Sequence, residues 1–259
     1  MICCICNSSM RFSFVAKILR KYSVSMFHCD DCGYICSEKP YWLSEAYEDS
    51  IVLSDTGIMA RNIDISRRIA SFLYFCVGNR GNGPWLDCAG GYGIFTRIMR
   101  DYGFDFYWSD KYSKNIVARG FDAPLGEKYS GITAIEAIEH TENPKIFVGD
   151  ALASTGADFF VFTTETYEGS PPSPEDWWYY GFHSGQHISF FQVRTLRRLA
   201  KVFGFYYTSA SNFHIFSRYP LSRLMVKFAT GKVSGIAQFL IRRRLESKVV
   251  SDRLKMIGD

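Results

Sequence analysis

Apolar and polar residues follow each other along this chain in short segments that favour helices and strands in turn. Apolar side chains recur at helical spacing over residues 61–77, and the Gly- and Asn-rich residues 78–84 predict a loop. Further apolar runs predict strands at residues 85–88, 104–108, 132–135 and 158–163, helices at residues 94–102, 143–153 and 191–203, and a terminal strand or hairpin at residues 206–216. This alternation predicts an α/β fold, in which helices cover both faces of a mostly parallel sheet.

Both ends of the chain differ from this central pattern. Residues 1–40 contain paired cysteines. Residues 41–217 form the next unit, in which residues 40–60 are an aromatic-rich linker with a docking face and the alternating elements follow from residue 61. Residues 218–259 combine apolar and basic positions and predict two amphipathic helices. We therefore expect a small cysteine-containing unit, an α/β domain and a basic helical extension.

Composition fits one folded domain with small additions. The chain has 259 residues, of which 47% are hydrophobic, enough for a sizeable core. Its net charge is +4, but the residues from 218 onward carry +7 and the remainder −3. Because the positive charge is small and gathers in one apolar extension, nucleic acid is not favoured as a partner. The extension has two interpretations: contact with a membrane surface, or packing on the domain or on a second subunit.

The cysteines point to a metal rather than to disulfides. No secretory signal and no run of about 18 apolar residues is visible, so we expect a cytoplasmic protein, in which thiols stay reduced. Cys3 and Cys6 form one Cys-x-x-Cys pair, and Cys29 and Cys32 form a second. Two such pairs predict a four-thiolate structural zinc site in a zinc ribbon, whose strands lie within residues 10–27. Cys4 is an alternative ligand to Cys3, and unliganded cysteines are the alternative to a metal site.

A glycine-rich turn between a predicted strand and helix is the strongest signal for a ligand. Asp87 ends the strand, and Ala89, Gly90, Gly91 and Gly93 follow it. Such a turn lets the backbone approach a ligand, which then faces the N-terminus of the next helix. The spacing is not the dinucleotide pattern G-x-G-x-x-G.

The next strands also end in polar residues. Asp110 ends the second strand, where an acid can accept hydrogen bonds from ribose hydroxyls; a helix cap or turn is the alternative. Glu136, Glu139 and His140 follow the third strand and offer two carboxylates and an imidazole to a divalent ion. The alternative is that they only fix the loop.

An aromatic segment follows the fourth strand. It carries Trp177-Trp178-Tyr179-Tyr180, and then His187 directly before the predicted helix at residues 191–203. Aromatic, proline-containing loops over strand ends often form substrate walls. His187 is a candidate general base, with Glu165 and Glu168 as alternatives, unless these side chains serve only as a helix cap or as surface acids.

Together these motifs resemble one branch of the class I S-adenosylmethionine (SAM) methyltransferases. The glycine turn, Asp110, Gly120-Phe121-Asp122, Glu136-x-x-Glu139-His140 and the aromatic segment through His187 occur in the order of that branch, whose members carry an amino-terminal zinc-binding knuckle and commonly occur with polysaccharide or nucleotide-sugar biosynthesis. The resemblance covers about residues 1–217. It implies a Rossmann-like sheet, SAM as methyl donor, and a sugar, sugar nucleotide or lipid-linked glycan as acceptor.

The resemblance also implies roles for individual residues. It assigns Asp87, Gly90, Gly91 and Gly93 to the methionine part of SAM, with Ala89 and Glu136 beside them. Asp110 is implied at the ribose, and Phe121 and Asp122 near the adenine. For the proton of the acceptor hydroxyl it leaves His187, Glu165 and His140 as candidates. Relatives of the small-RNA and ubiquinone-biosynthesis types hold a divalent ion at the equivalents of Glu136, Glu139 and His140.

The sequence disfavours one other function, sugar C-methylation, and leaves two open, a non-catalytic binding module and RNA methylation. Sugar C-methyltransferases share the knuckle but have a large additional carboxyl-terminal domain that this sequence lacks, so O-methylation is favoured. A non-catalytic module that holds a protein or nucleic-acid partner through a degenerate core is the alternative to an enzyme. RNA methylation is a third interpretation.

Overall fold

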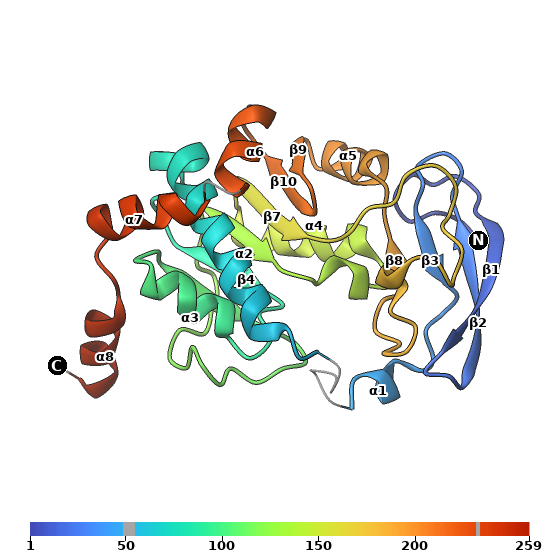
Figure 1. Cartoon of the computed structure of the whole chain (residues 1–259), viewed down its shortest axis with the longest axis horizontal. Helices are drawn as coiled ribbons and strands as arrows, with labels where there is room; N and C mark the ends of the chain where they lie inside the picture. Colours follow the sequence, from blue (N-terminus) through green and yellow to red (C-terminus); the bar gives the residue numbers. More distant parts are fainter. Residues whose placement is uncertain (49–54, 232–233, 259) are drawn as a thin grey trace.

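The computed structural model describes residues 1–48, 55–231 and 234–258 and contains two β-sheets. The larger sheet has the strand order β5-β4-β6-β7-β10-β9 (Figure 1). The pairs β4–β5, β4–β6 and β6–β7 are parallel, whereas β10 runs antiparallel to both β7 and β9. Its strands are β4 (Trp85–Cys88), β5 (Phe106–Ser109), β6 (Gly131–Ala134), β7 (Phe159–Thr163), β9 (Tyr206–Ala210) and β10 (Phe213–Ser217). The expected α/β fold is confirmed.

Helices cover both faces of this sheet because it is apolar on each side. One face packs against α4 (Pro144–Thr155) and α5 (Val193–Val202), and the other against α2 (Ile58–Phe72) and α3 (Ile94–Asp101). Two adjacent residues set the start of α4. The Asn143 side chain caps the helix by accepting the N–H of Ile146 at 3.2 Å, and Pro144 occupies the first helical position.

The predicted element boundaries hold to within about three residues. The main difference lies after α2, where the last part of the predicted helix is a π-helix (Leu73–Val77) and the predicted loop begins with a 3₁₀ turn (Gly78–Gly81). In the linker, a short helix α1 (Leu43–Ala46) forms, and the part of the expected docking face at residues 49–54 lies outside the described residues.

The smaller sheet joins the cysteine-containing unit at residues 1–40 to the aromatic segment that precedes α5. It has the order β1-β2-β3-β8 and is built from β1 (Arg11–Ile18), β2 (Tyr22–His28), β3 (Ile35–Ser37) and β8 (Ser189–Phe190). The two strands expected within residues 10–27 are present. β8 was not predicted, because two residues are too few to show a strand pattern. Residues 177–190 therefore lie against the cysteine-containing unit and share an aromatic core with it.

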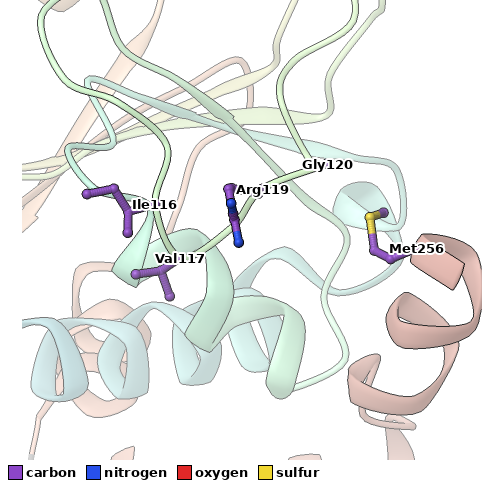
Figure 2. Close-up of a pocket in the computed structure, with 5 residues that line it drawn as sticks. All are labelled: Ile116, Val117, Arg119, Gly120 and Met256. Atoms are coloured by element: carbon purple, nitrogen blue, oxygen red, sulfur yellow. The ribbon is translucent and has the colours of Figure 1, made fainter.

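The described part of the basic extension forms three helices rather than the two expected. These are α6 (Arg223–Thr230), α7 (Ser234–Arg244) and α8 (Val249–Ile257). Val226 of α6 and Ala237 of α7 are buried in the core on the α2 side of the sheet. α8 lies near Gly120 (Figure 2), and Met256 of α8 is one of the residues that line a hollow of about 470 Å³. Within the described residues, no helix combines the length and apolarity that crossing a membrane requires.

Candidate functional site

A cavity of about 1070 Å³ lies at the carboxyl ends of β4, β5 and β6, where parallel sheets bind their ligands. Three parts of the chain enclose it: the turns that follow these strands, the start of α2 with α1, and the aromatic segment that contains Trp178 and His187. Sequence signals found the first and the third of these parts. Tyr47 and Arg61, from the second, were not assigned to the site in advance, although the aromatic residues near position 47 indicated a docking face.

The glycine turn needs its glycines for different reasons. A Cβ on Gly90 would lie 2.7 Å from Asp87 Oδ2 and 2.7 Å from Trp108 Cδ1, so a side chain does not fit there. Gly91 and Gly93 have positive φ angles of 54° and 85°, and Gly93 is the N-cap of α3. Ala89 also has a positive φ, 59°, and such strained backbone clusters at functional sites.

Two aspartates hold this turn in place. The Asp110 carboxylate accepts the backbone N–H groups of Gly91 at 2.9 Å and of Tyr112 and Ser113 at 2.7 Å, and it also lines the cavity. Asp87 is 1% exposed and accepts the hydroxyl of Thr96 at 2.8 Å. Burial raises the pKa of Asp87 to about 7. Asp110 thus has the turn role that was its alternative, and its place in the lining of the cavity keeps the predicted ribose contact open.

The residues expected near an adenine lie elsewhere. Phe121 is 2% exposed, and the Arg100 guanidinium lies 3.7 Å from its ring centre. Asp122 accepts the side-chain amide of Asn115 at 3.2 Å. Neither residue lines the cavity. The Phe121 carbonyl instead accepts the backbone N–H of Trp108 in β5 at 2.8 Å, which holds this segment against the edge strand of the sheet.

Glu136 lines the cavity, but its carboxylate is already engaged. Its backbone has a positive φ of 49°, and Oε1 accepts the hydroxyl of Thr163 at 2.7 Å. The expected ion-binding set of Glu136, Glu139 and His140 is therefore not assembled. Among the described residues, the third member that comes together with Glu139 and His140 is His187, with one ligand atom of each within 4.8 Å of the others.

Glu139 is a buried carboxylate with one oxygen that is unpaired among the described residues. It is fully buried, its Oε1 accepts the Tyr179 hydroxyl at 2.6 Å, and no described residue is hydrogen-bonded to its Oε2. Burial, together with the nearby charge of Glu136, raises the pKa of Glu139 to about 8. A buried carboxylate oxygen without a partner is costly, so it marks a position that fits a cation or a donor from a ligand.

The two histidines of the cluster are oriented by fixed partners. His140 Nδ1 is hydrogen-bonded to the Tyr47 hydroxyl at 2.7 Å, and the two imidazole centres lie 4.8 Å apart. His187 Nδ1 lies 2.7 Å from the Tyr179 carbonyl oxygen. A carbonyl can only accept, so Nδ1 of His187 carries the proton and Nε2 keeps a free lone pair. Burial lowers the pKa of His187 to about 4, so this imidazole is neutral at pH 7.

Glu165, the alternative base, does not line the cavity. Burial raises its pKa, with a contribution from the charge of Glu136. Of the four candidate bases, His140 and His187 line the cavity, whereas Glu165 and Glu168 do not. The hydrogen bond of His187 Nδ1 to a carbonyl fixes its tautomer, so its Nε2 is free to accept a proton.

The four paired cysteines also meet. Cys3 Sγ lies 3.6 Å from Cys32 Sγ, and Cys6 Sγ lies 3.4 Å from Cys29 Sγ. Tetrahedral zinc with bonds of about 2.3 Å to sulfur places its ligands about 3.8 Å apart, so these distances fit. The unit is tied to the larger domain, because the Thr195 hydroxyl donates to the Cys32 carbonyl at 2.6 Å.

The chain is similar to known proteins over more than half of its length. A family model described as a methyltransferase domain matches residues 59–210. No curated protein matches the chain. Among solved structures, magnesium protoporphyrin IX methyltransferase from Synechocystis PCC 6803 with bound SAH is 13% identical, with a TM-score of 0.44 over 67% of this chain and 90% of that chain.

Two further solved structures are similar at the same level. An O-methyltransferase family protein from Burkholderia thailandensis is 12% identical, with a TM-score of 0.49 over 69% of this chain and 62% of that one. An O-methyltransferase family 2 protein from Planctomyces limnophilus DSM 3776, in complex with apigenin, is 13% identical, with a TM-score of 0.44 over 68% of this chain and 65% of that one.

Proposed function

Because this chain belongs to the methyltransferase domain family, we propose that it transfers the methyl group of SAM to a hydroxyl oxygen of a sugar, a sugar nucleotide or a lipid-linked glycan. The observation that carries the proposal is the convergence of the glycine turn and His187 on one cavity of about 1070 Å³. That volume accommodates a nucleoside-sized donor together with part of an acceptor.

The donor assignment is supported by the turn after β4. Gly90 and Gly91 leave backbone exposed to a ligand, and Asp110 stands at the end of the neighbouring strand, where an acid suits ribose hydroxyls. The cavity also has more acids than bases in its lining, which suits a sulfonium cation. SAM supplies an already reactive methyl group, so the protein mainly has to align donor and acceptor.

The acceptor assignment is supported by aromatic side chains at the rim. Trp178 lines the cavity and is 77% exposed, and Tyr47 stacks on Tyr112 with ring centres 5.8 Å apart. Flat aromatic faces bind the C–H faces of sugar rings, while the hydroxyl groups require polar partners such as Arg61.

His187 is the proposed base. As the oxygen–carbon bond forms and the sulfur–carbon bond breaks, the hydroxyl proton passes to His187 Nε2, and S-adenosylhomocysteine leaves as a neutral thioether. The Tyr179 carbonyl, 2.7 Å from Nδ1, holds the ring in the tautomer that this transfer needs. In-line geometry and removal of the proton together lower the barrier.

Calorimetry with SAM and turnover of labelled SAM on sugar nucleotides test this function. We expect His187→Ala to bind SAM as the unaltered protein does but to turn over about 10² to 10⁴ times more slowly. Glu165→Gln is the matched control and should stay within about twofold, because Glu165 lies outside the cavity. Absence of binding by SAM and S-adenosylhomocysteine at millimolar concentration would reject the enzyme and favour the non-catalytic binding module.

A second candidate is the same transfer assisted by a divalent ion. The partnerless Oε2 of Glu139, with His140 and His187 close by, fits imidazole- and carboxylate-binding ions. Such an ion would polarise the acceptor hydroxyl and lower its pKa. In that case Glu139→Gln should lose ion-dependent turnover while Glu136→Gln keeps it. Full turnover after removal of loosely bound metal would exclude this candidate.

We also propose that the four cysteines hold a structural Zn²⁺. Four thiolates leave zinc no open coordination position, so this ion would stabilise the small sheet and take no part in methyl transfer.

A further inference from the structure

A long part of the chain contains no acidic residue. From residue 177 to residue 245 there are eleven Lys and Arg and no Asp or Glu, so the rest of the chain carries a net charge of −7 although the total is +4. Chance rarely keeps acids out of so long a segment in a protein where a tenth of all residues are Asp or Glu. The segment begins inside the aromatic wall of the cavity and ends with α7.

The structure gathers most of this segment along one border of the molecule. β9 is the edge strand of the larger sheet, and both α5 and α6 pack against it, while α7 continues from α6. In Figure 1, α5, β9 and α6 lie side by side along the upper border, with α7 at its end. The positive charge that is concentrated in this part of the sequence therefore lies along one border of the folded molecule.

The basic side chains of this border are not neutralised. The nine Lys and Arg of the segment whose side chains the structure describes are all exposed, and none has an ion-pair partner among the described residues. Every Lys or Arg that forms an ion pair among the described residues lies outside the segment, as Arg61 does, which pairs with Asp55 at 2.6 Å. Unpaired exposed cations produce a positive potential that attracts an anionic surface.

Large apolar side chains lie among these cations. On α6, Leu224 is 80% exposed and Phe228 51% exposed, next to Arg223 and Lys227 in the sequence. On α7, Phe239 is 57% exposed, and the Arg243 guanidinium lies 4.1 Å from its ring centre. Helices that bind a bilayer surface show this combination, because apolar groups enter the headgroup layer while cations meet anionic lipids.

We infer that the border formed by α5, β9, α6 and α7 binds an anionic lipid bilayer. The charge complementarity selects an anionic surface, and the exposed leucine and phenylalanine side chains select a bilayer over a nucleic acid, which offers no apolar layer at its phosphates. The binding site is separate from the cavity, so a membrane-bound molecule keeps the glycine turn and His187 free.

Sedimentation with vesicles tests the inference. We expect the full chain to bind phosphatidylcholine vesicles that contain about 30% phosphatidylserine and to bind pure phosphatidylcholine weakly, with binding that falls as salt rises. Each basic side chain near the surface should contribute about fivefold, so Arg223→Ala with Lys227→Ala should lower the partition coefficient about 25-fold. The partition coefficient of Leu224→Ser with Phe228→Ser should fall at least tenfold.

The matched control removes two exposed lysines at the opposite end of the molecule. Lys17→Ala with Lys39→Ala lowers the net charge by the same amount but should leave binding within about twofold, because these residues lie in the small sheet region. Equal binding to neutral and anionic vesicles, or an equal loss in the control, would overturn the inference. So would an RNA oligomer that binds more tightly than the vesicles and is insensitive to Leu224→Ser with Phe228→Ser. Circular dichroism verifies that each variant is folded.

Discussion

Asp87 shows how much a single buried residue can reveal about this site. Its carboxyl group is 1% exposed, and two threonine hydroxyls are its hydrogen-bond donors, Thr96 at 2.8 Å and Thr133 at 3.2 Å. Hydroxyl donors lower its pKa, but the loss of water raises it more, to about 7. The folded protein therefore holds a proton on Asp87 that the unfolded chain releases near pH 4.

This difference predicts a pH-dependent stability. Because the folded pKa is raised, the contribution is complete below about pH 4 and is lost as pH rises through 7, by up to about 4 kcal/mol. Asp87→Asn is neutral at every pH and should lack this slope. Urea unfolding without SAM, at pH 5 and pH 8, measures it. Glu127→Gln removes an exposed carboxylate as control and should keep the slope; an Asp87→Asn protein with an unchanged slope would contradict the assignment.

Among the elements, the small sheet is assembled from parts of the chain that are far apart in the sequence. β1, β2 and β3 are closed by β8 from a distant part of the sequence, and the turn after β2 carries Cys29 and Cys32. A Cβ on Gly33 would lie 2.4 Å from Gln192 Oε1, so this turn is pressed directly against the N-terminus of α5. Loss of a metal from the cysteines should therefore disturb the contact with α5 as well as the small sheet.

Cys29→Ser tests this element. We expect zinc content to fall from about one to well below one per chain, and thermal unfolding to begin at a lower temperature, because metal binding contributes to the folding of such units. Metal analysis and calorimetry measure the two effects. Cys4→Ser is the control and should retain zinc, since Cys4 is outside the group of four. Full zinc in Cys29→Ser would reject the four-thiolate site, and loss in Cys4→Ser would show that Cys4 replaces Cys3.

At the scale of the whole molecule, a buried ion-pair network ties the end of the chain to the sheet. Arg100 of α3 is 4% exposed and donates to both carboxylate oxygens of Asp252 on α8, at 2.8 and 2.7 Å. It also donates to Asp105 at 2.7 Å and to the Phe106 carbonyl at 2.9 Å. Burial raises the pKa of Asp252, but the hydrogen bonds and charge of Arg100 outweigh it and lower the pKa.

Removing one partner leaves a buried charge incompletely paired. Asp252→Ala should cost about 3 kcal/mol of stability, or release α8 so that protease cleaves near residue 248 while the sheet stays folded. Urea unfolding and limited proteolysis distinguish the two outcomes, and both support the network. Ser251→Ala, one residue away on the exposed side of α8, is the control. Unchanged stability and unchanged cleavage in Asp252→Ala would show that the pair contributes nothing.

Sequence alone determined whatever depends on spacing along the chain. Hydrophobic periodicity predicted the central strands and helices, the glycine turn identified the end of β4 that opens into the cavity, and the two Cys-x-x-Cys pairs identified a group of four thiols. These features are local, since each follows from residues within a few positions of one another. The same is true of the basic extension, whose composition was visible although its number of helices was not.

Tertiary structure decided which distant side chains meet. It brought His187 close to Glu139 and His140, whereas the carboxylate of Glu136 is bonded to the Thr163 hydroxyl. It placed Phe121 beneath Arg100, paired β8 with β3, and gathered an acid-free segment along one border of the sheet. Such contacts depend on packing between segments that are far apart in the chain. Their energies depend on the whole fold, so the spacing of residues within one segment cannot predict them.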